Sequence, residues 1–376
     1  MSDLIPVFTC TNGNYEPEIP QRFECKPAVA LVVSNTGERE ILAPKSLSKC
    51  DQNLKKVSGL DMNGHSIDVL DNNLVLGASS VEDRKDWWFI SLANPRSGLL
   101  SNKWIRTKVE GQPTPRNHVT FAAGNSLYYF GGDFQSQSKM EDNDWTLIKW
   151  LKKDSDENED PFEPFQKFTS HACSIKIDHM TFLVTGGTHS SSAVSDVFEV
   201  DILDRTVQTI GHMNHARTQH ACTLISKSIS VDGEKTYSRA ILITGGVSNT
   251  DNRNTIVKKA ELFSLDNMES KDLSNEMQSP RFKHSMVQLG EEVLALGGET
   301  ENGITNLIEI FLFDSNSDFD ALISGTWKAH TKVLRSSSTS NLAVTTLPKS
   351  AVECNKETCQ CGLSGESRIS GGSVVR

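Results

Sequence analysis

Residues 280–298 read PRFKHSMVQLGEEVLALGG: an arginine and a histidine, a short apolar run, a turn, a second apolar run and a glycine pair. Segments with the same plan occur at residues 64–79, 115–132, 170–187 and, with an insertion, 217–246. In the first of these segments, Ala78 stands where the others have their second glycine. No segment shows a sustained apolar period of 3.6 residues, so little helix is expected. The sequence therefore predicts an all-β protein built from repeated units.

The length of the repeat indicates which repeated architecture this is. Each copy is followed by a second β-rich segment that runs into Asp, Asn or Pro, and often by a further short one, which gives four strands per repeat. The repeated histidines are 53, 53, 49 and 64 residues apart, at His65, His118, His171, His220 and His284. The longest interval contains a polar insertion at residues 226–238. A period near 50 residues with four strands is typical of a β-propeller blade.

The apolar runs and the glycine pairs have a physical explanation in such a fold. Residues 182–184 and 241–243 are apolar without alternation, which predicts strands buried on both faces between neighbouring sheets. The glycine pairs end these strands where the backbone must turn sharply beside a crowded centre. We assign a structural role to Gly131, Gly132, Gly186, Gly187, Gly245, Gly246, Gly297 and Gly298.

Each end of the chain carries half of a repeat. Residues 341–352 are similar to the first half of a sixth copy, and residues 28–44 are similar to a second half. We predict that C-terminal inner strands pair with N-terminal outer strands in one sheet, which closes the ring and removes its open edges. The expected organisation is an N-terminal extension (1–22), a propeller (23–352) and a Cys-containing, Ser/Gly-rich tail (353–376).

Over about residues 28–352 the sequence resembles kelch-repeat propellers. The glycine pairs are the core of this resemblance, and arginines two or three residues before a repeated histidine support it. Trp104 and Trp327 fit the late aromatic position of a blade, which the other copies lack. The resemblance implies a six-bladed kelch-type β-propeller with four antiparallel strands per blade. It implies a protein-interaction platform in most cases and an enzyme in a minority.

Arginines and histidines recur where the repeats begin, and two interpretations follow. In the structural one, each imidazole is partly buried and hydrogen-bonded to nearby backbone. In the functional one, the side chains converge at the mouth of the central channel and hold a carboxylate of an acidic peptide or a sugar acid. The candidate binding residues are Arg116, His118, Arg217, His220, Arg281 and His284.

No sequence motif indicates catalysis. The chain lacks Gly-x-Ser-x-Gly, a Walker loop and His-Glu-x-x-His, and the three histidines of residues 212–220 have a loop pattern rather than ligand spacing. We therefore expect no catalytic residue, metal or cofactor, and a scaffold that binds a protein or peptide partner through the loops after the glycine pairs and the channel mouth. The alternative is a small-molecule enzyme or lectin-like binder that resembles the kelch-type N-acetylneuraminate epimerases.

Charge and hydropathy exclude some partners. The net charge of −10 and the pI of about 5.5 argue against a nucleic-acid surface, and no apolar stretch is long enough for a membrane helix. We expect a monomer. The N-terminus lacks the features of a signal peptide, and the chain has no Asn-x-Ser/Thr acceptor, so the expected location is cytoplasmic. A secreted chain without its leader would look the same.

The eight cysteines fall into two groups. Cys173 and Cys222 lie in the apolar runs HACSI and HACTL, and we expect both to be buried, small hydrophobic side chains. The others lie near the chain ends, and closure of the ring would bring five of them together. A disulfide or metal clip is one interpretation of this group: Cys10, Cys25, Cys354, Cys359 and Cys361.

Overall fold

The structure is a computed structural model. It describes residues 28–34, 39–42, 53–54, 60–70, 73–80, 86–91, 105–107, 118–123, 126–131, 138–141, 144–147, 151–152, 171–178, 180–189, 191–204, 206–231, 234–249, 254–289, 292–313, 322–336 and 339–348. These residues form six sheets of four or five strands and three two-stranded hairpins. Among them the only helical turn is at residues 322–323, and no helix is long and apolar enough to cross a membrane.

Two sheets come from the first part of the chain. Sheet 1 contains β4 (Leu60–Leu70), β5 (Asn73–Ser80), β6 (Asp86–Ser91) and β7 (Ile105–Thr107). Sheet 2 contains β8 (His118–Ala123), β9 (Ser126–Gly131), β10 (Ser138–Glu141) and β11 (Asp144–Leu147). In both sheets the strands are antiparallel and follow one another in chain order.

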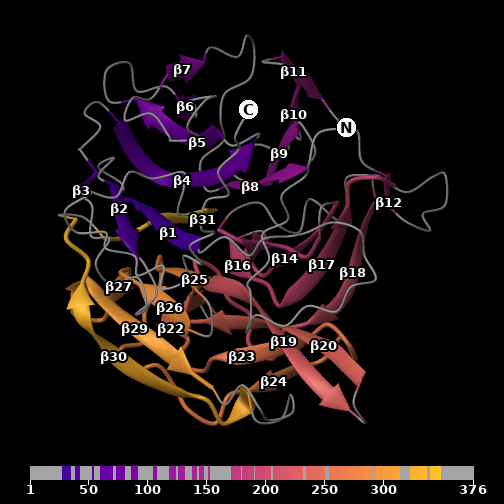
Figure 1. The fold of residues 1–376 in the computed structure, drawn as a ribbon, viewed down its shortest axis with the longest axis vertical. Helices are drawn as coiled ribbons and strands as arrows, with labels where there is room; N and C mark the ends of the chain where they lie inside the picture. Colours follow the sequence, from indigo (N-terminus) through magenta and orange to yellow (C-terminus); the bar gives the residue numbers. More distant parts are fainter. Residues whose placement is uncertain are drawn as a thin grey trace, which may run out of the picture.

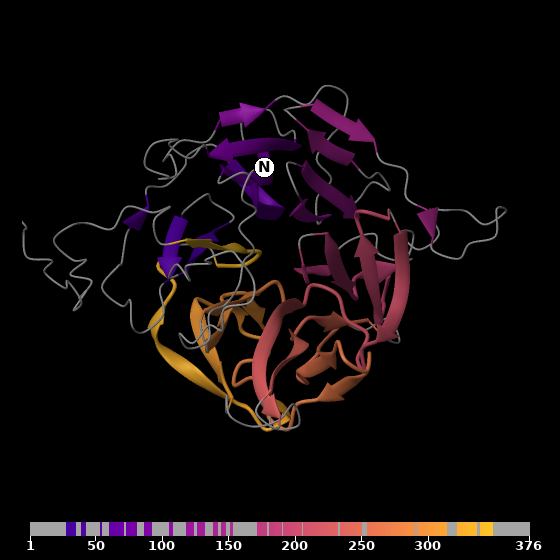
Figure 2. The ribbon, with the colours of Figure 1, turned by 45° about the vertical axis from the view of Figure 1, so that its right-hand side comes forward.

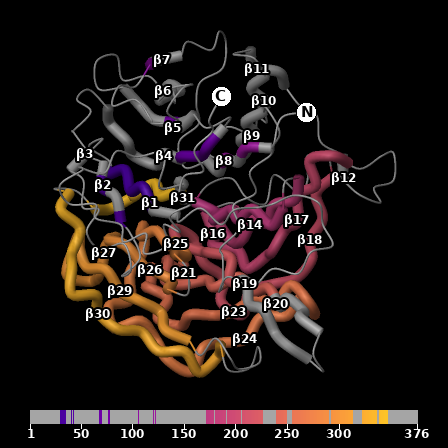
Figure 3. Tube along the Cα trace, in the orientation of Figure 1, coloured from indigo at the N-terminus to yellow at the C-terminus, as the bar shows by residue number. Residues whose placement is uncertain are grey.

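The next three sheets repeat this order and lie side by side (Figure 3). Sheet 3 contains β13 (Cys173–Lys176), β14 (Thr181–Thr185), β17 (Asp196–Asp201) and β18 (Thr206–His212), with β12 (Leu151–Lys152) parallel to β18. Sheet 4 contains β19 (Ala221–Val231), β20 (Glu234–Thr244), β23 (Glu261–Ser264) and β24 (Ser270–Asp272). Sheet 5 contains β25 (Ser285–Leu289), β26 (Glu292–Leu296), β29 (Leu307–Leu312) and β30 (Thr326–Val333).

Strands from the two ends of the described chain share sheet 6. It contains β31 (Ala343–Pro348), β1 (Ala28–Val33), β2 (Arg39–Leu42) and β3 (Asn53–Leu54). β1 and β31 pair in antiparallel register from Ala28↔Pro348 to Val33↔Ala343. The six sheets are arranged around a common centre, with the first strand of each sheet, or β31 in sheet 6, nearest to it (Figures 1 and 2).

The core consists of layers between neighbouring sheets, because successive residues of a strand face opposite sides. In β20, Ile241 and Ile243 pack in a cluster with Leu183 of sheet 3. Leu242, which lies between them, packs in a cluster with Val293 of sheet 5. A third cluster joins sheets 5 and 6. Burial on both faces, which the unalternating apolar runs predict, is confirmed for these strands.

One sequence-based expectation is wrong in this part of the chain, and another is made more specific. The polar insertion at residues 226–238 lengthens a hairpin, since β19 and β20 stay paired from Ala221↔Thr244 to Val231↔Glu234. Cys173 and Cys222 are not separate buried thiols, because they form a disulfide. The disulfide was not predictable from the repeats, because both cysteines occur in the tripeptide HAC, which suggests equivalent positions in consecutive copies.

Candidate functional site

The strand directions bring two kinds of segment to the same end of sheets 3, 4 and 5. In sheet 4 the first residue of β19, Ala221, lies opposite the last residue of β20, Thr244. The loop before β19 therefore meets the glycine pair that follows β20. Sheets 3, 4 and 5 each add a hairpin after the pair: β15–β16 (Thr188–His189, Ser192–Ala193), β21–β22 (Val247–Ser248, Thr255–Ile256) and β27–β28 (Glu299–Thr300, Gly303–Ile304). We call the surface formed by these hairpins and by the loops before β19 and β25 the hairpin face.

The hairpins are fixed to these loops by backbone hydrogen bonds. Thr218 and Val247 exchange N–H···O=C bonds of 2.9 and 2.8 Å, and Phe282 and Glu299 exchange bonds of 2.9 and 2.8 Å. Asn249 also joins neighbouring hairpins, since its Oδ1 accepts the N–H of Ala193 (2.9 Å) and its Nδ2 donates to the carbonyl of Ser191 (2.6 Å). The face is thus held on a rigid base rather than on free loops.

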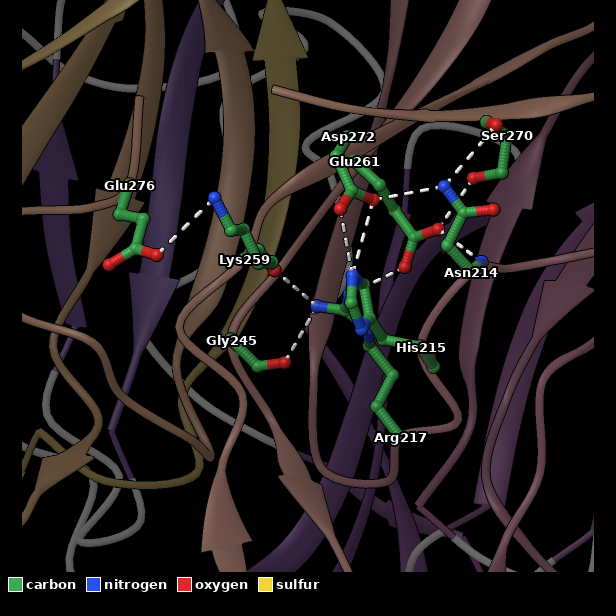
Figure 4. A network of polar contacts seen from close by, with 9 residues as sticks. All are labelled: Asn214, His215, Arg217, Gly245, Lys259, Glu261, Ser270, Asp272 and Glu276. Atoms are coloured by element: carbon green, nitrogen blue, oxygen red, sulfur yellow. Dashed lines mark hydrogen bonds and ion pairs between the residues drawn. The ribbon is translucent and has the colours of Figure 1, made fainter. Parts of the chain in front are cut away.

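The Arg217 side chain, whose polar contacts are drawn in Figure 4, is part of this base. It has no exposed surface. Its Nη2 donates to Glu261 Oε1 at 2.5 Å, and its Nη1 donates to the carbonyls of Gly245 and Lys259, each at 3.0 Å. Its own carbonyl accepts the N–H of Gly187 in sheet 3 at 3.0 Å. Arg217 therefore joins sheet 3, through its backbone, to sheet 4, through its side chain.

Arg281 is equally buried and joins sheets 4 and 5. Its Nη2 pairs with Glu309, and its Nη1 donates to the carbonyls of Gly297 (2.9 Å) and Leu307 (3.0 Å). Burial lowers the pKa of both guanidinium groups, and the paired glutamates oppose that shift. Contrary to the functional interpretation, Arg217 and Arg281 do not present free donors to a carboxylate ligand, because protein oxygens already occupy them.

His220 and His284 are buried links between sheets. His220 Nε2 lies 2.8 Å from Thr185 Oγ1 of sheet 3, and His284 Nε2 lies 2.8 Å from Thr244 Oγ1 of sheet 4. Burial, followed by the charge of Arg217, lowers the pKa of His220 to about 3, and burial lowers the pKa of His284 well below its ordinary value. Both imidazoles are therefore neutral near pH 7. Their partners are threonine hydroxyls rather than the backbone, and neither imidazole reaches the open face.

The other predicted residues can be placed only in part. His118 follows Arg116 and Asn117 in the sequence and lies opposite Gly131 in the β8–β9 register. His220 and His284 have the same position relative to their first glycines. The side chain of His118 and the whole of Arg116 and Gly132 lie outside the described residues, as do Cys10, Cys25, Cys354, Cys359 and Cys361. Predictions for these residues stay predictions.

His171 is not the counterpart of His220, although both begin the tripeptide HAC. Cys173 lies opposite Thr185, the residue before the glycine pair of sheet 3, whereas Ala221 lies opposite Thr244, the residue before that of sheet 4. The sequence match is therefore displaced by one residue, and His171 takes the position of Gln219. A one-residue displacement is easy to miss in an alignment, yet it moves every following side chain to the other face of its strand.

The residues at the position of Gln219 in successive sheets form the inner rim of the hairpin face. His171, Gln219, Lys283 and Asn341 all have positive φ, at 59°, 55°, 52° and 50°. A chain of N–H···O=C bonds joins them: Gln219 to His171 (3.0 Å), Lys283 to Gln219 (2.9 Å) and Asn341 to Lys283 (2.9 Å). Three of them directly precede a residue at the His220 position, so the repeated spacing is the sequence signal for this rim, which the charges of the side chains alone do not reveal.

A carboxylate lies beside this rim. Glu299 Oε1 accepts bonds from Lys283 Nζ at 3.0 Å and from Ser340 Oγ at 2.6 Å. Desolvation raises the pKa of Glu299, but the bonds from Ser340 and Lys283 outweigh it, and the net shift is downward. Lys283 also lies over the ring of Phe282, 5.2 Å from its centroid. The rim is thus polar and internally paired.

A second polar cluster lies beside Arg217 (Figure 4). His215 Nε2 is 3.0 Å from Asp272 Oδ2, and Asn214 Nδ2 donates to Asp272 Oδ1 at 2.9 Å. Both His215 and Asp272 are partly exposed. Within the described ranges, no group of three or more His, Cys, Asp or Glu residues could hold a metal ion.

Antiparallel sheets around a common centre, with glycine pairs after their second strands, define a kelch-type β-propeller. The chain belongs to the Attractin/LZTR1 beta-propeller family, whose model matches residues 96–356, more than half of the chain. No curated protein matches the sequence significantly. Among solved structures, one titled "Structure of YjhT" is similar, with a TM-score of 0.54 and 14% sequence identity, covering 80% of this chain and 98% of that one. At this identity the similarity shows the fold alone.

Proposed function

We propose that the chain is a non-catalytic, monomeric interaction module that binds a protein or peptide partner through its hairpin face. In this proposal the six sheets are the blades of a closed ring, and the β1–β31 pairing in sheet 6 is the closure. Ring closure leaves no sheet edge between the first and last repeats for another chain to pair with.

The observation that carries the proposal is the contrast between a fixed base and exposed hairpin tips. Ser191 and Ser192, Asn254 and Thr255, and residues 301–304 are exposed at the tips of the three hairpins. Their sequences differ from hairpin to hairpin. Ile304, at 61% exposure, places a large apolar side chain at one tip. Varied side chains on a rigid scaffold suit the recognition of a partner surface.

The alternative, a small-molecule enzyme of the epimerase kind, has less support. It needs free guanidinium groups to hold a carboxylate and a group that moves protons. Arg217 and Arg281 are saturated by Glu261, Glu309 and carbonyl oxygens. His220 and His284 are buried and have low pKa values.

The test compares two surfaces that lie on opposite sides of the ring. The test variant is Glu301→Ala/Asn302→Ala/Ile304→Ala on the β27–β28 tip. The matched control is Leu203→Ala, since Leu203 is 74% exposed and follows Asp201, which pairs with Thr181 at the end of sheet 3 away from the hairpins. Crosslinking and affinity capture identify a partner, and binding is then measured with that purified partner.

We expect the tip variant to weaken binding at least roughly tenfold, which corresponds to about 1.4 kcal/mol. The Leu203→Ala variant should bind like the unchanged protein, and both variants should keep its melting temperature. Unchanged binding by the tip variant, together with equivalent substitutions in the other two hairpins, would contradict the proposal.

A further inference from the structure

The one-residue displacement of the HAC tripeptides has a chemical consequence for their cysteines. If the tripeptides were in register, Cys173 and Cys222 would occupy equivalent positions and project to the same side of their strands. The register instead places Cys173 at the position of Ala221, and places Ser174 at the position of Cys222. Successive residues in a strand point to opposite faces. The displacement therefore turns Cys173 to the opposite side from Cys222.

The packing of sheet 4 shows which side each cysteine faces. Ala221 packs in the cluster shared with Val293 of sheet 5, so its position faces the following sheet. Cys222 packs in the cluster shared with Ile175 and Leu183 of sheet 3, so its position faces the preceding sheet. By the same geometry Cys173 of sheet 3 faces sheet 4, and the two side chains meet between β13 and β19. Their Cα atoms are 6.0 Å apart, within the range of disulfides, and the bond is formed.

We infer that the Cys173–Cys222 disulfide is a native covalent link between the innermost strands of sheets 3 and 4, and that the chain folds in an oxidising compartment. Disulfides persist in such compartments and are rare where thiols are kept reduced. The inference replaces the cytoplasmic location expected from the missing acceptor sites and signal features. It is independent of the proposed partner binding.

The chemistry of formation is a thiol–disulfide exchange. One cysteine thiolate attacks the disulfide of a thiol oxidoreductase and forms a mixed disulfide, and the second thiolate then displaces the enzyme. A bond forms between the two Sγ atoms, each thiol gives up a proton and an electron, and the oxidoreductase leaves as a dithiol.

The link reinforces a junction that supports two hairpins. Above it, His220 contacts Thr185, and Asn249 joins the β15–β16 hairpin to the β21–β22 hairpin. Cys222 is 7% exposed and Cys173 is partly buried, so the bond is partly shielded once the sheets pack. We expect reduction to loosen this pair of sheets before the rest of the ring.

The experiment uses the full chain produced in an oxidising compartment, with Cys10, Cys25, Cys50, Cys354, Cys359 and Cys361 changed to serine. The protein is denatured and alkylated without reductant, and its peptides are identified by mass spectrometry. We expect a crosslinked pair of peptides that contain Cys173 and Cys222. Quantitative alkylation of both cysteines under these conditions, without reductant, would overturn the inference.

Two single variants, each lacking one of the two cysteines, are used because a variant that lacks both could fail to fold. Cys173→Ala and Cys222→Ser introduce the residues that the repeat carries at the equivalent positions, Ala221 and Ser174. Reductant should lower the melting temperature of the two-cysteine protein by roughly 5 °C and leave either single variant unchanged. An equal response of all three proteins would also overturn the inference. Partner binding through the tip of β27–β28 can persist in either case, so the two proposals fail separately.

Discussion

Arg217 and Arg281, which are 64 positions apart in the chain, make the same set of contacts in neighbouring sheets. Each donates to the carbonyl of the first glycine of its sheet and to a glutamate on the third strand. Each also accepts, through its backbone carbonyl, the N–H of the second glycine of the preceding sheet. A side chain chosen as a ligand-binding candidate is therefore a repeated link between sheets.

Removal of this link should destabilise the fold strongly. Arg217→Ala leaves Glu261 buried without its partner, and loss of one member of a buried ion pair costs about 3–5 kcal/mol. The double variant Arg217→Met/Glu261→Leu should be more stable than Arg217→Ala, because sheet 3 already has the buried Phe198 at the position of Glu261. Urea denaturation measures these differences. Wild-type stability of Arg217→Ala would show that the pair does not hold the sheets.

Gly246→Val should also destabilise the protein by several kcal/mol. Gly246 has φ of +86°, and a Cβ there would lie 2.7 Å from the Thr218 carbonyl and 2.8 Å from His220 Cβ. Gly303→Ala is the matched control, since Gly303 has φ of +106° but no atom within 4 Å of the added Cβ. The control should lose only about 1 kcal/mol from backbone strain. Thermal melts of both variants decide whether steric contact adds to the strain.

The buried histidines should make stability depend on pH. His220 and His284 are neutral in the folded state but titrate near pH 6.5 when unfolded, so the unfolded state binds more protons below that pH. Stability should therefore fall as pH falls from 7.5 to 5, by about 2 kcal/mol for each histidine. Asp68 acts in the opposite sense below pH 6, because burial raises its pKa to about 6.

The measurement for this prediction is therefore a comparison of slopes. The free energy of unfolding of His220→Gln/His284→Gln, determined in urea between pH 5 and 7.5, should vary less with pH than that of the unchanged protein. Parallel curves would mean that the imidazoles are accessible to protons in the folded state.

The terminal strands offer a test of ring closure. Deletion of residues 1–44 removes β1 and β2 and leaves β31 without its partner, so we expect aggregation. Deletion of residues 1–22 is the control, because it leaves every described strand intact. Size-exclusion chromatography distinguishes the outcomes. A soluble monomer with unaltered melting after the longer deletion would refute closure through this pair.

The repeat made the all-β fold and the sheet order predictable from sequence. Glycine pairs indicate where strands end in sharp turns, and unalternating apolar runs indicate strands that are buried on both faces. Both features recur in most copies of the repeat. The paired β19–β20 extension had a different sequence signal, the Asp232-Gly233 pair between β-forming residues, which is typical of a hairpin turn. The polar composition of residues 226–238 made this signal less obvious than an apolar run.

The site was less predictable for two physical reasons. An arginine in a sequence does not show whether its donors meet protein oxygens or solvent, and the acceptors of both Arg281 Nη atoms are 16 to 28 residues away. The tripeptide HAC suggested equivalence of His171 and His220, but strand register is set by backbone pairing rather than by identical letters. The same displacement concealed the disulfide.

In the rim formed by His171, Gln219, Lys283 and Asn341, the backbone joins neighbouring sheets and the side chains are not needed for this connection. Its continuity depends on peptide groups alone, since the bonds between successive sheets run from amide to carbonyl. The four side chains can therefore be exchanged for others that tolerate a left-handed backbone without breaking the rim. Substitution at these four positions can therefore change the polar surface beside the hairpins while the amide-to-carbonyl bonds keep neighbouring sheets joined.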